Sequence, residues 1–510
     1  MSSADESLVQ TDAGVVRGRI HDGVVEFRNI PYAAPPVGHR RFLAPEPVVP
    51  WEGEFDATQP FGPSAPQPVS KFRRLDVADL AADGWHKGDD YLSLNVWAPG
   101  RRSDRPRPVM VWIHGGAFTI GRKDLAAFNG VSFARSGVVI VVINYRLGVE
   151  GFLPIAGAPT NLGLRDMIAA LHWVQSNVAA FGGDPGNVTI FGQSAGAISI
   201  ASLVASPLTT GLFRRAILQS GGGTALPIDT AKRAVTRIAK SLAVPPDVEG
   251  FRSRTVADAL PAMQRAARPG VVDFRDDTGY NPYLGMMLVG PVYGDDVVPQ
   301  HPLTSLRHGA GRDVDLLIGT TADEVDLFFA TTMLRFAPRP VARWMLRHVH
   351  PNGNGLYDAY ARHHPERGAG MVWSAVVSDL FFRLPARQFA EAHQGRSHVY
   401  EFDWPSPALK GRLGAAHGLD IAFAFDVLSV ITGPRRVGGE APPQAVATHL
   451  HGLCVRFAED GFVPWPQFDP VERRVYQIAA QHHVHEPVLP AADFQPKRKE
   501  PPDRTRSTGR

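Results

Sequence analysis

The residues best suited to chemistry form the pentapeptide Gly-Gln-Ser-Ala-Gly at positions 192–196. An apolar, strand-like run precedes it at residues 188–191, and a helix-compatible run follows it at residues 197–204. In this strand–turn–helix context, the G-x-S-x-G pattern is typical of a nucleophilic serine held in a strained turn. Glycines are needed there because a Cβ would collide with the neighbouring strand and helix. The pattern therefore predicts that Ser194 presents its hydroxyl as a nucleophile at the end of a sheet strand.

A second motif, His-Gly-Gly-Ala-Phe at positions 114–118, directly follows the strand-like run 109–113. Its small residues leave backbone N–H groups free to point at a bound oxygen. Acyl transfer passes through a tetrahedral oxyanion that such amides stabilise. The two motifs together predict nucleophilic acyl transfer. His114 itself lies immediately at the strand end, so we expect a structural role for it.

A serine nucleophile also needs a base and a group that orients the base. Histidine suits proton transfer near neutral pH, and a carboxylate would hold its tautomer. The chain has 19 histidines, and the residue pattern alone does not select one. The late cluster of His482, His483 and His485 has no carboxylate or cysteine spacing that would indicate a metal site. We therefore expect these three to be ordinary surface or core polar residues.

The elements that must position these groups are short β-branched apolar runs alternating with helical patterns. The runs lie at residues 109–113, 138–143, 188–191, 216–219, 316–318 and 399–402. They suit strands buried on both faces, and residues 164–178 show the spacing of one helix face. This alternation predicts an α/β fold with a mostly parallel central sheet flanked by helices. Residues 226–293 and 330–395 are expected to be helical insertions.

Composition and charge narrow the class of protein. The 510 residues are 44% hydrophobic and 20% charged, which excludes a disordered or fibrous chain. The net charge is +3, but residues 496–510 contain six basic and two acidic residues, so the rest is near neutral. We expect one domain over residues 1–490 and a basic, disordered tail over 491–510. Such a tail could contact nucleic acid or anionic lipid, although a solvated terminus without a fixed partner is favoured and no nucleic-acid partner is expected.

The cysteine count and the hydropathy pattern bear on the compartment. Cys454 is the only cysteine, so no intrachain disulfide can form, and its apolar neighbours favour a small buried hydrophobe. The first residues carry no apolar leader-like run, and no apolar run is long enough to span a bilayer. These observations favour a cytoplasmic protein without stable membrane insertion.

With these motifs in hand, the chain resembles the type-B carboxylesterase/cholinesterase family of the α/β-hydrolases. The resemblance covers roughly residues 15–468 and rests on long, ordered motifs. They lie at residues 27–33, 89–96, 114–118, 144–148, 161–166, 181–185, 192–196 and 219–221. It implies the α/β-hydrolase fold, with the helical insertions forming the substrate pocket.

The resemblance also implies a Ser–Glu–His triad in that chain order. Carried onto this sequence, it makes Ser194 the nucleophile, Glu324 the acid after the run 316–318, and His417 the base. Asp323 and Asp326 stay as less favoured alternatives for the acid.

Further site residues come from the same resemblance. The implied oxyanion donors are the amides of Gly116, Ala117 and Ala195, and no cofactor or metal is implied. Two buried structural ion pairs are implied as well, Arg41 with Asp89 and Arg146 with Asp166.

Three positions depart from the family pattern, one of them Tyr91, where many members have cysteine. Gln193 stands beside the nucleophile where the family usually has glutamate, which removes a negative charge near the base. Val325 follows the acid where glycine is frequent. The change at position 193 is expected to weaken attraction for cationic substrates and to alter how the imidazolium is stabilised.

The expected function is that of a serine carboxylesterase, which hydrolyses a small-molecule ester through an acyl-enzyme as a monomer or small homo-oligomer. An amidase or carbamate hydrolase of the same fold is the alternative, since the same triad can cleave those bonds. A non-catalytic binding module of this fold is less favoured, because such members lose a triad residue and all three candidates are present here.

Overall fold

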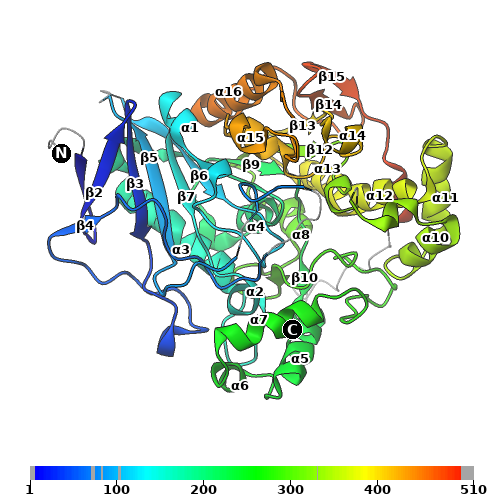
Figure 1. Ribbon diagram of the computed structural model, residues 1–510, viewed down its shortest axis with the longest axis horizontal. Coiled ribbons are helices and arrows are strands. Elements are labelled where there is room, and N and C mark those ends of the chain that lie inside the picture. Colours follow the sequence, from blue (N-terminus) through cyan, green and yellow to red (C-terminus); the bar gives the residue numbers. More distant parts are fainter. Residues whose placement is uncertain (1–5, 70–74, 82–83, 102–104, 330, 496–510) are drawn as a thin grey trace, which may run out of the picture.

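The computed structural model describes residues 6–69, 75–81, 84–101, 105–329 and 331–495. Figure 1 shows a twisted central sheet with helices around it. The sheet has the strand order β1-β2-β3-β5-β7-β6-β8-β9-β12-β13-β14-β15, with β4 paired to β2. The strands are β1 Glu6–Thr11, β2 Gly14–His21, β3 Val24–Pro31, β4 Glu54–Asp56, β5 Ser93–Pro99, β6 Arg107–Ile113, β7 Val139–Ile143, β8 Gly183–Gln193, β9 Arg215–Gln219, β12 Asp315–Thr321, β13 Ser397–Phe402, β14 Arg474–Gln477 and β15 His482–His485. A separate two-stranded sheet pairs β10 Leu226–Pro227 with β11 Val292–Tyr293.

The centre of the sheet is parallel. From β7 through β6, β8, β9, β12 and β13 to β14, each strand pairs in parallel with the next. The outer strands β1, β2, β3 and β5 pair antiparallel, and β15 closes the other edge antiparallel to β14. The predicted α/β architecture is confirmed. Each of the six apolar runs lies in one of these parallel strands.

Alternate residues of β6 fall into two separate hydrophobic cores. Val109, Val111 and Ile113 belong to one cluster, with the buried sides of α3 and α4. Met110 and Trp112 belong to the other, with α15 and α16. Because successive side chains of a strand point to opposite faces, helices must cover both faces of the sheet.

The helices flank the sheet and occur in both predicted insertions, although residues 267–291 of the first insertion form no helix. They are α1 Val131–Arg135, α2 Gly148–Phe152, α3 Leu162–Asn177, α4 Ala195–Val204, α5 Ile228–Leu242, α6 Val248–Arg252, α7 Val256–Ala266, α8 Pro302–Arg307, α9 Asp326–Phe329, α10 Arg339–Arg347, α11 Gly353–His363, α12 Ala369–Ser378, α13 Leu384–Ala392, α14 Ala408–Gly411, α15 Leu419–Ala424 and α16 Gln444–Asp460. α5 to α7 belong to the first insertion and α10 to α13 to the second. A π-helical turn, Asp379–Arg383, joins α12 to α13.

One of the two implied ion pairs is present and the other is wrong. Arg146 Nη2 lies 2.6 Å from Asp166 Oδ1, and both side chains are buried. Arg41 pairs with Glu150 of α2 at 2.7 Å instead of with Asp89, which is exposed. A buried guanidinium needs a buried carboxylate. Glu150 meets that need from a neighbouring helix far along the chain.

The folded chain continues a few residues past the predicted domain end. Ala491 is buried, and the 3₁₀ turn η9, Pro490–Phe494, packs against α11. The remaining predicted tail, residues 496–510, lies outside the described residues. Within the described part of the chain, no helix combines the length and the apolar character needed to cross a membrane.

Candidate active site

Ser194 lies at a sharp turn between β8 and α4. Its backbone has φ +57° and ψ −122°, a strained conformation for a residue other than glycine. A Cβ on Gly192 would lie 2.5 Å from Ile113 O of the adjacent strand β6, and one on Gly196 would lie 2.0 Å from the same atom. Both positions therefore require glycine, which lets the turn press against β6 and raise the serine above the sheet edge.

The loop after β6 lies directly beside this turn. A Cβ on Gly115 would come within 3.1 Å of Ser194 Cβ, so the loop backbone sits against the nucleophile. Gly116 and Ala117 have positive φ angles of 116° and 51°, which turn the chain back on itself here. Both residues line the same cavity as Ser194, while Ala195 is buried at the first position of α4.

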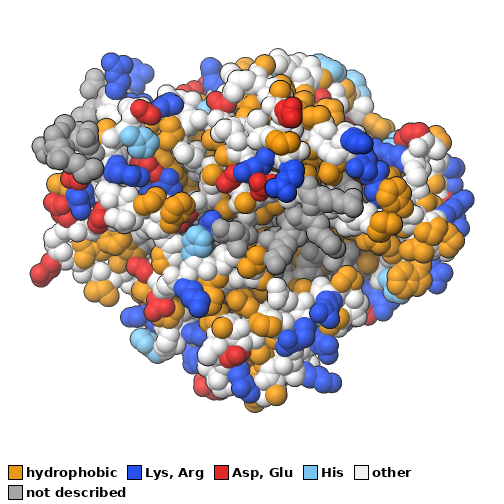
Figure 2. Space-filling model, viewed as in Figure 1, with side chains coloured by type: hydrophobic (Ala, Val, Ile, Leu, Met, Phe, Trp, Pro, Cys, Tyr) orange, Lys and Arg blue, Asp and Glu red, His pale blue; other side chains and the backbone are white. Residues whose placement is uncertain are grey.

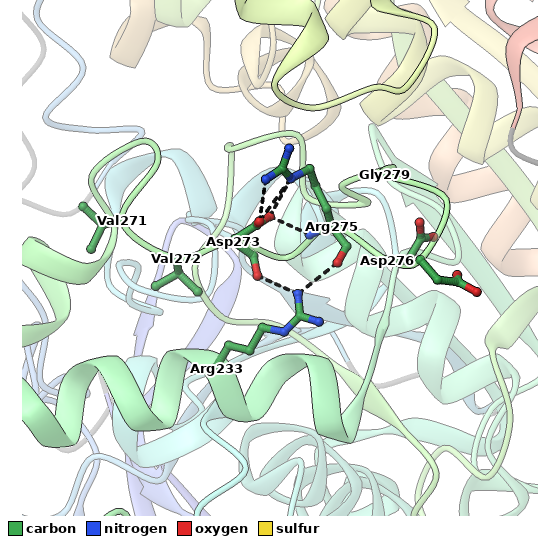
Figure 3. Close-up of a pocket in the computed structure, with 8 residues that line it drawn as sticks. Arg233, Val271, Val272, Asp273, Arg275, Asp276 and Gly279 are labelled. Atoms are coloured by element: carbon green, nitrogen blue, oxygen red, sulfur yellow. Dashed lines mark hydrogen bonds and ion pairs between the residues drawn. The ribbon is translucent and has the colours of Figure 1, made fainter.

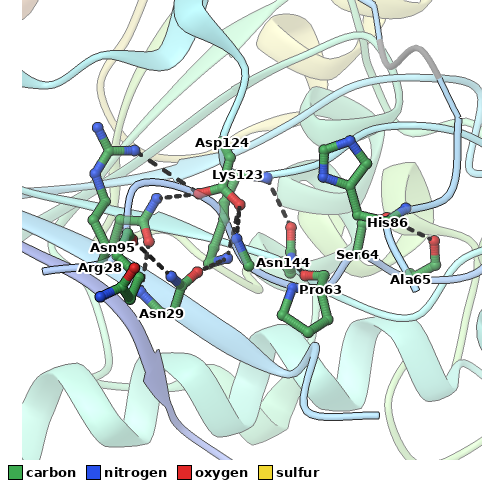
Figure 4. A network of polar contacts seen from close by, with 12 residues as sticks. Arg28, Asn29, Pro63, Ser64, Ala65, His86, Asn95, Lys123, Asp124 and Asn144 are labelled. Atoms are coloured by element: carbon green, nitrogen blue, oxygen red, sulfur yellow. Dashed lines mark hydrogen bonds and ion pairs between the residues drawn. The ribbon is translucent and has the colours of Figure 1, made fainter. Parts of the chain in front are cut away.

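A polar network anchors the far end of this loop (Figure 4). Lys123 Nζ donates to Asn29 Oδ1 at 2.7 Å and pairs with Asp124 at 3.1 Å, and Asn95 donates to Asp124 at 2.8 Å. Lys123 has no exposed surface, and burial lowers its pKa. Asn144 adds a fourth contact by accepting from the Lys123 backbone N–H at 2.7 Å. The loop is thus tied to three strands, β3, β5 and β7, or to the turns that follow them.

His417 and Glu324 meet although 93 positions separate them. His417 Nδ1 lies 2.6 Å from Glu324 Oε2. Glu324 has no exposed surface, and its other oxygen accepts from the Thr321 N–H at 2.8 Å. A carboxylate only accepts, so Nδ1 must carry the proton. The second ring nitrogen, Nε2, is then left with a lone pair.

The partner of that lone pair is Gln193. Its Nε2 lies 3.0 Å from His417 Nε2, and the amide must donate because the imidazole nitrogen can only accept. Ser194, Gln193 and His417 all line one cavity. The sequence marked Gln193 as a departure from the family, but it did not predict this contact.

The alternative acids make other contacts. Asp323 accepts from the Ala415 N–H at 3.1 Å and pairs with Arg367 at 3.5 Å. Asp326 accepts from the Ser374 hydroxyl at 2.6 Å, and burial raises its pKa to about 6. The carboxylate in contact with His417 is that of Glu324.

Sequence reasoning missed a second buried carboxylate, Asp420 on α15. It accepts from Gln219 Nε2 at 2.8 Å, and its other oxygen has no hydrogen-bond partner within the described structure. Burial, and after it the nearby charge of Glu324, raise the pKa of Asp420 to about 7. The only sequence signal was its position three residues after His417.

The other histidines noted in the sequence do not take part in the contact between His417 and Glu324. His114 is buried, stacks on Tyr145 with ring centroids 4.4 Å apart, and contacts Gly115 O through Nδ1 at 2.8 Å. Burial lowers the pKa of His114 to about 4, so it stays neutral as a structural residue would. His482 and His485 are exposed ends of β15. Across the described residues, no group of three His, Cys, Asp or Glu is placed to hold a metal ion.

The cavity at Ser194 has a volume of about 190 Å³. Its walls come from the loop at Gly116 to Ile120, from α9 through Leu327 and Phe328, and from the region after His417. Val77, Leu80 and Ala81, from the loop before β5, close another side. Among the described residues that line it, none is Asp, Glu, Lys or Arg, and His417 is the only one whose side chain readily becomes charged.

A larger and more open hollow of about 640 Å³ lies elsewhere, between α5 and residues 271–279 (Figure 3). Arg275 pairs with Asp273 at 2.7 Å, and Arg233 donates to the backbone oxygens of both residues. The described residues that line this hollow include no serine, cysteine or histidine. It therefore offers no nucleophile or imidazole base, so the smaller cavity is the one equipped for acyl transfer.

Comparisons with known proteins identify the family of the chain. The carboxylesterase family model matches residues 5–494. Para-nitrobenzyl esterase of Bacillus subtilis is 34% identical, covering 90% of this chain and 92% of the relative. Phenmedipham hydrolase of Pseudarthrobacter oxydans is also 34% identical, with the same coverage of both chains.

Solved structures are similar throughout. A PNB esterase superposes with a TM-score of 0.82 at 31% identity, covering 96% of this chain and 99% of the other. Carboxylesterase EST55 of Geobacillus stearothermophilus gives 0.80 at 33% identity, covering 96% and 100%. The fold, the cavity and these matches across nearly the whole length lead to one conclusion: the chain belongs to the carboxylesterase family and is a serine carboxylesterase with the α/β-hydrolase fold.

Proposed function

We propose that Ser194, His417 and Glu324 form the catalytic triad, and that the amides of Gly116, Ala117 and Ala195 form the oxyanion hole. Ser194 Oγ attacks the ester carbonyl while His417 Nε2 takes its proton. The oxyanion collapses, and His417 returns the proton to the departing alcohol. Water, deprotonated by His417, then attacks the acyl-enzyme; the bond to Ser194 Oγ breaks, the acid leaves, and His417 returns the proton to Oγ.

The observation that carries this proposal is the 2.6 Å contact between His417 Nδ1 and Glu324 Oε2. It leaves Nε2 unprotonated and places it in the cavity that Ser194 lines. A buried carboxylate at that distance stabilises the imidazolium that forms when the serine gives up its proton. Asp323 and Asp326 make other contacts, which supports Glu324 as the acid.

Gln193 holds the base in its resting position. Its amide occupies the lone pair that must receive the serine proton, so this hydrogen bond opens before each attack. The amide is neutral, so it holds the ring without adding a charge that would favour the protonated form. Gln193 is therefore proposed as a positioning residue for His417.

The cavity supports a neutral, apolar ester as substrate. Its walls are mainly apolar, with Thr119, Gln193, Ser194 and His417 as the polar side chains, and no carboxylate of the described residues lines it to attract a cationic group. A volume of about 190 Å³ admits a compact group beside the reacting carbonyl. Hydrolysis rates for esters of graded length, and for a neutral and a cationic ester of equal size, test this. A preference for the cationic ester would contradict the proposal.

The triad is tested with purified Ser194→Ala, assayed on a nitrophenyl ester and checked for folding by thermal melting. We expect loss of hydrolysis and of covalent labelling by a fluorophosphonate, with an unchanged melting temperature. A folded variant that keeps most of the activity would rule out Ser194 as the nucleophile. Matched ester, amide and carbamate substrates would separate an esterase from the alternative amidase or carbamate hydrolase.

The compartment and the assembly stay proposals as well. Cys454, the single cysteine, is buried, and burial raises its pKa to about 12, so it is an inert thiol. This is compatible with the proposed cytoplasmic location. A monomer or a small homo-oligomer is expected, and sedimentation velocity would distinguish them.

A further inference from the structure

An exposed apolar patch lies on the second insertion, on the 3₁₀ turn η6, Met333–Phe336, and on α10. Its members are large side chains exposed by 40% to 80%: Met333, Leu334, Phe336, Val341 and Trp344. These are five of the fourteen exposed large hydrophobic side chains in the described structure, gathered within twelve residues of chain. Single exposed apolar residues are ordinary, whereas a cluster of this kind marks an interaction site.

The patch is exposed although α10, which carries part of it, is packed against the rest of the protein through its opposite face. Ala342 and Leu346, on the opposite face of α10, have no exposed surface, and α10 packs against α11 and α12. Val341 and Trp344, three positions apart, form one outward stripe. The helix therefore has a buried apolar face and a second apolar face that no described residue covers.

The same segment is strongly basic. Residues 331–348 contain Arg335, Arg339, Arg343 and Arg347 and no acidic residue. The facing acid is Asp358 of α11, which pairs with Arg339 at 2.8 Å and with Arg343. Arg335 differs from the other three, because its Nε and Nη1 are buried and its charge acts on Asp326. One carboxylate against the remaining three guanidinium groups leaves a net positive surface. Figure 2 shows hydrophobic and basic side chains gathered together on the side of the molecule where α10 lies.

This combination favours an anionic partner over a second copy of the chain. A twofold contact between copies would set the same arginines against one another. Tryptophan and phenylalanine beside arginines match the interface of an anionic bilayer, where aromatic rings enter the headgroup region and guanidinium groups meet phosphates. We propose that the patch on η6 and α10 docks the protein reversibly onto an anionic phospholipid surface.

Docking through this patch would also place the cavity at Ser194 near the membrane. Leu327 and Phe328 of α9 line that cavity, and α9 contacts η6. The patch thus begins a few residues from the cavity wall, so docking would bring the cavity close to apolar esters dissolved in the bilayer. This consequence rests on the proposed function, whereas the docking itself does not.

The test is sedimentation of the full-length protein with vesicles of phosphatidylglycerol and phosphatidylcholine, or of phosphatidylcholine alone. We expect binding only to the anionic vesicles, weakened by salt. Phe336→Ser/Trp344→Ser should lower the partition coefficient about ten-fold or more. Phe61→Ser is the matched control, because Phe61 and Phe336 are both 64% exposed, and it should bind like the parent. Ser194→Ala should also bind normally, which separates docking from catalysis.

Two further measurements keep the result interpretable. Melting temperatures check that the variants fold, and Arg339→Gln/Arg347→Gln tests the patch without altering its apolar side chains. The basic residues 496–510 are the same in every variant, so their contribution cancels in the comparison. Absence of anionic vesicle binding, or equal binding by the patch variants and Phe61→Ser, would overturn the proposal. So would a dimer that the patch variants dissociate in the absence of any vesicle binding, since that result assigns the patch to a second copy.

Discussion

Replacing Gln193 by glutamate is expected to move the pH dependence of ester hydrolysis to higher pH. The substitution places a carboxylate where the amide nitrogen now lies, 3.0 Å from His417 Nε2. A negative charge there favours the protonated imidazole, which cannot act as a base. A higher pH is then needed to free the base, so the acid limb of kcat/KM should move upward.

The size of the shift follows from the distance. Two unit charges about 3 Å apart interact by about 5 kcal/mol at an effective dielectric constant of 20, which is an upper limit. Burial of the new carboxylate and its repulsion by Glu324 oppose this term. Neighbouring opposite charges usually move a titration by about one to three units. We expect the midpoint to rise by about one to two pH units, with a ten-fold or larger loss of kcat/KM on the acid side and a plateau within several-fold of the parent.

The assay is kcat/KM for a neutral nitrophenyl ester from pH 5 to pH 9. A neutral ester is needed because a charged one would respond to the new carboxylate directly. Gln193→Met is the matched control, since it removes the hydrogen bond and adds no charge. It should change the rate and raise the midpoint by much less than Gln193→Glu does, because the lost hydrogen bond favoured the neutral imidazole. A midpoint that stays in place in Gln193→Glu, or that falls, would refute the argument.

Three further outcomes are expected. Glu324→Gln keeps the size of the acid but removes its charge, and should lower kcat by about 10³-fold or more in the ester assay; a loss below ten-fold would assign the acid elsewhere. Burial raises the pKa of Asp420 from 3.8 to about 7, so its ionisation destabilises the folded state as pH rises between those values. Asp420→Asn should therefore gain up to about 4 kcal/mol over the parent at pH 8 and less than about 1 kcal/mol at pH 4; equal melting differences at both pH values would contradict this. Arg146→Met leaves Asp166 buried without its partner and should cost about 3 to 5 kcal/mol in denaturant unfolding; a neutral effect would show that the pair is dispensable.

Much of the architecture could be predicted from local sequence. Buried parallel strands need apolar residues at nearly every position, so the six runs were visible without any partner strand. The turn at Ser194 was visible for a similar reason, because Gly192 and Gly196 are required by backbone contacts with Ile113. Such signals survive in the sequence since each comes from a few neighbouring residues.

The partners of the catalytic groups could not be predicted in this way. Among 19 histidines, only the family resemblance pointed to His417, because its contact with Glu324 spans 93 positions. The order of strands in the sheet brings the ends of β8 and β12 to the same edge. That order cannot be predicted from the residues of either strand.

The sequence by itself determined the element types, the turn that raises Ser194 and the glycines around it, because these follow from backbone sterics and hydrophobic periodicity. Only the tertiary structure decided that Gln193 holds His417 Nε2, that Arg41 pairs with Glu150 instead of Asp89, and that Asp420 is buried behind the site. Each of these depends on which side chain, distant in the sequence, the fold places within contact distance of a buried polar group. Burial makes an unpaired charge or lone pair costly, so the packed fold selects the partner.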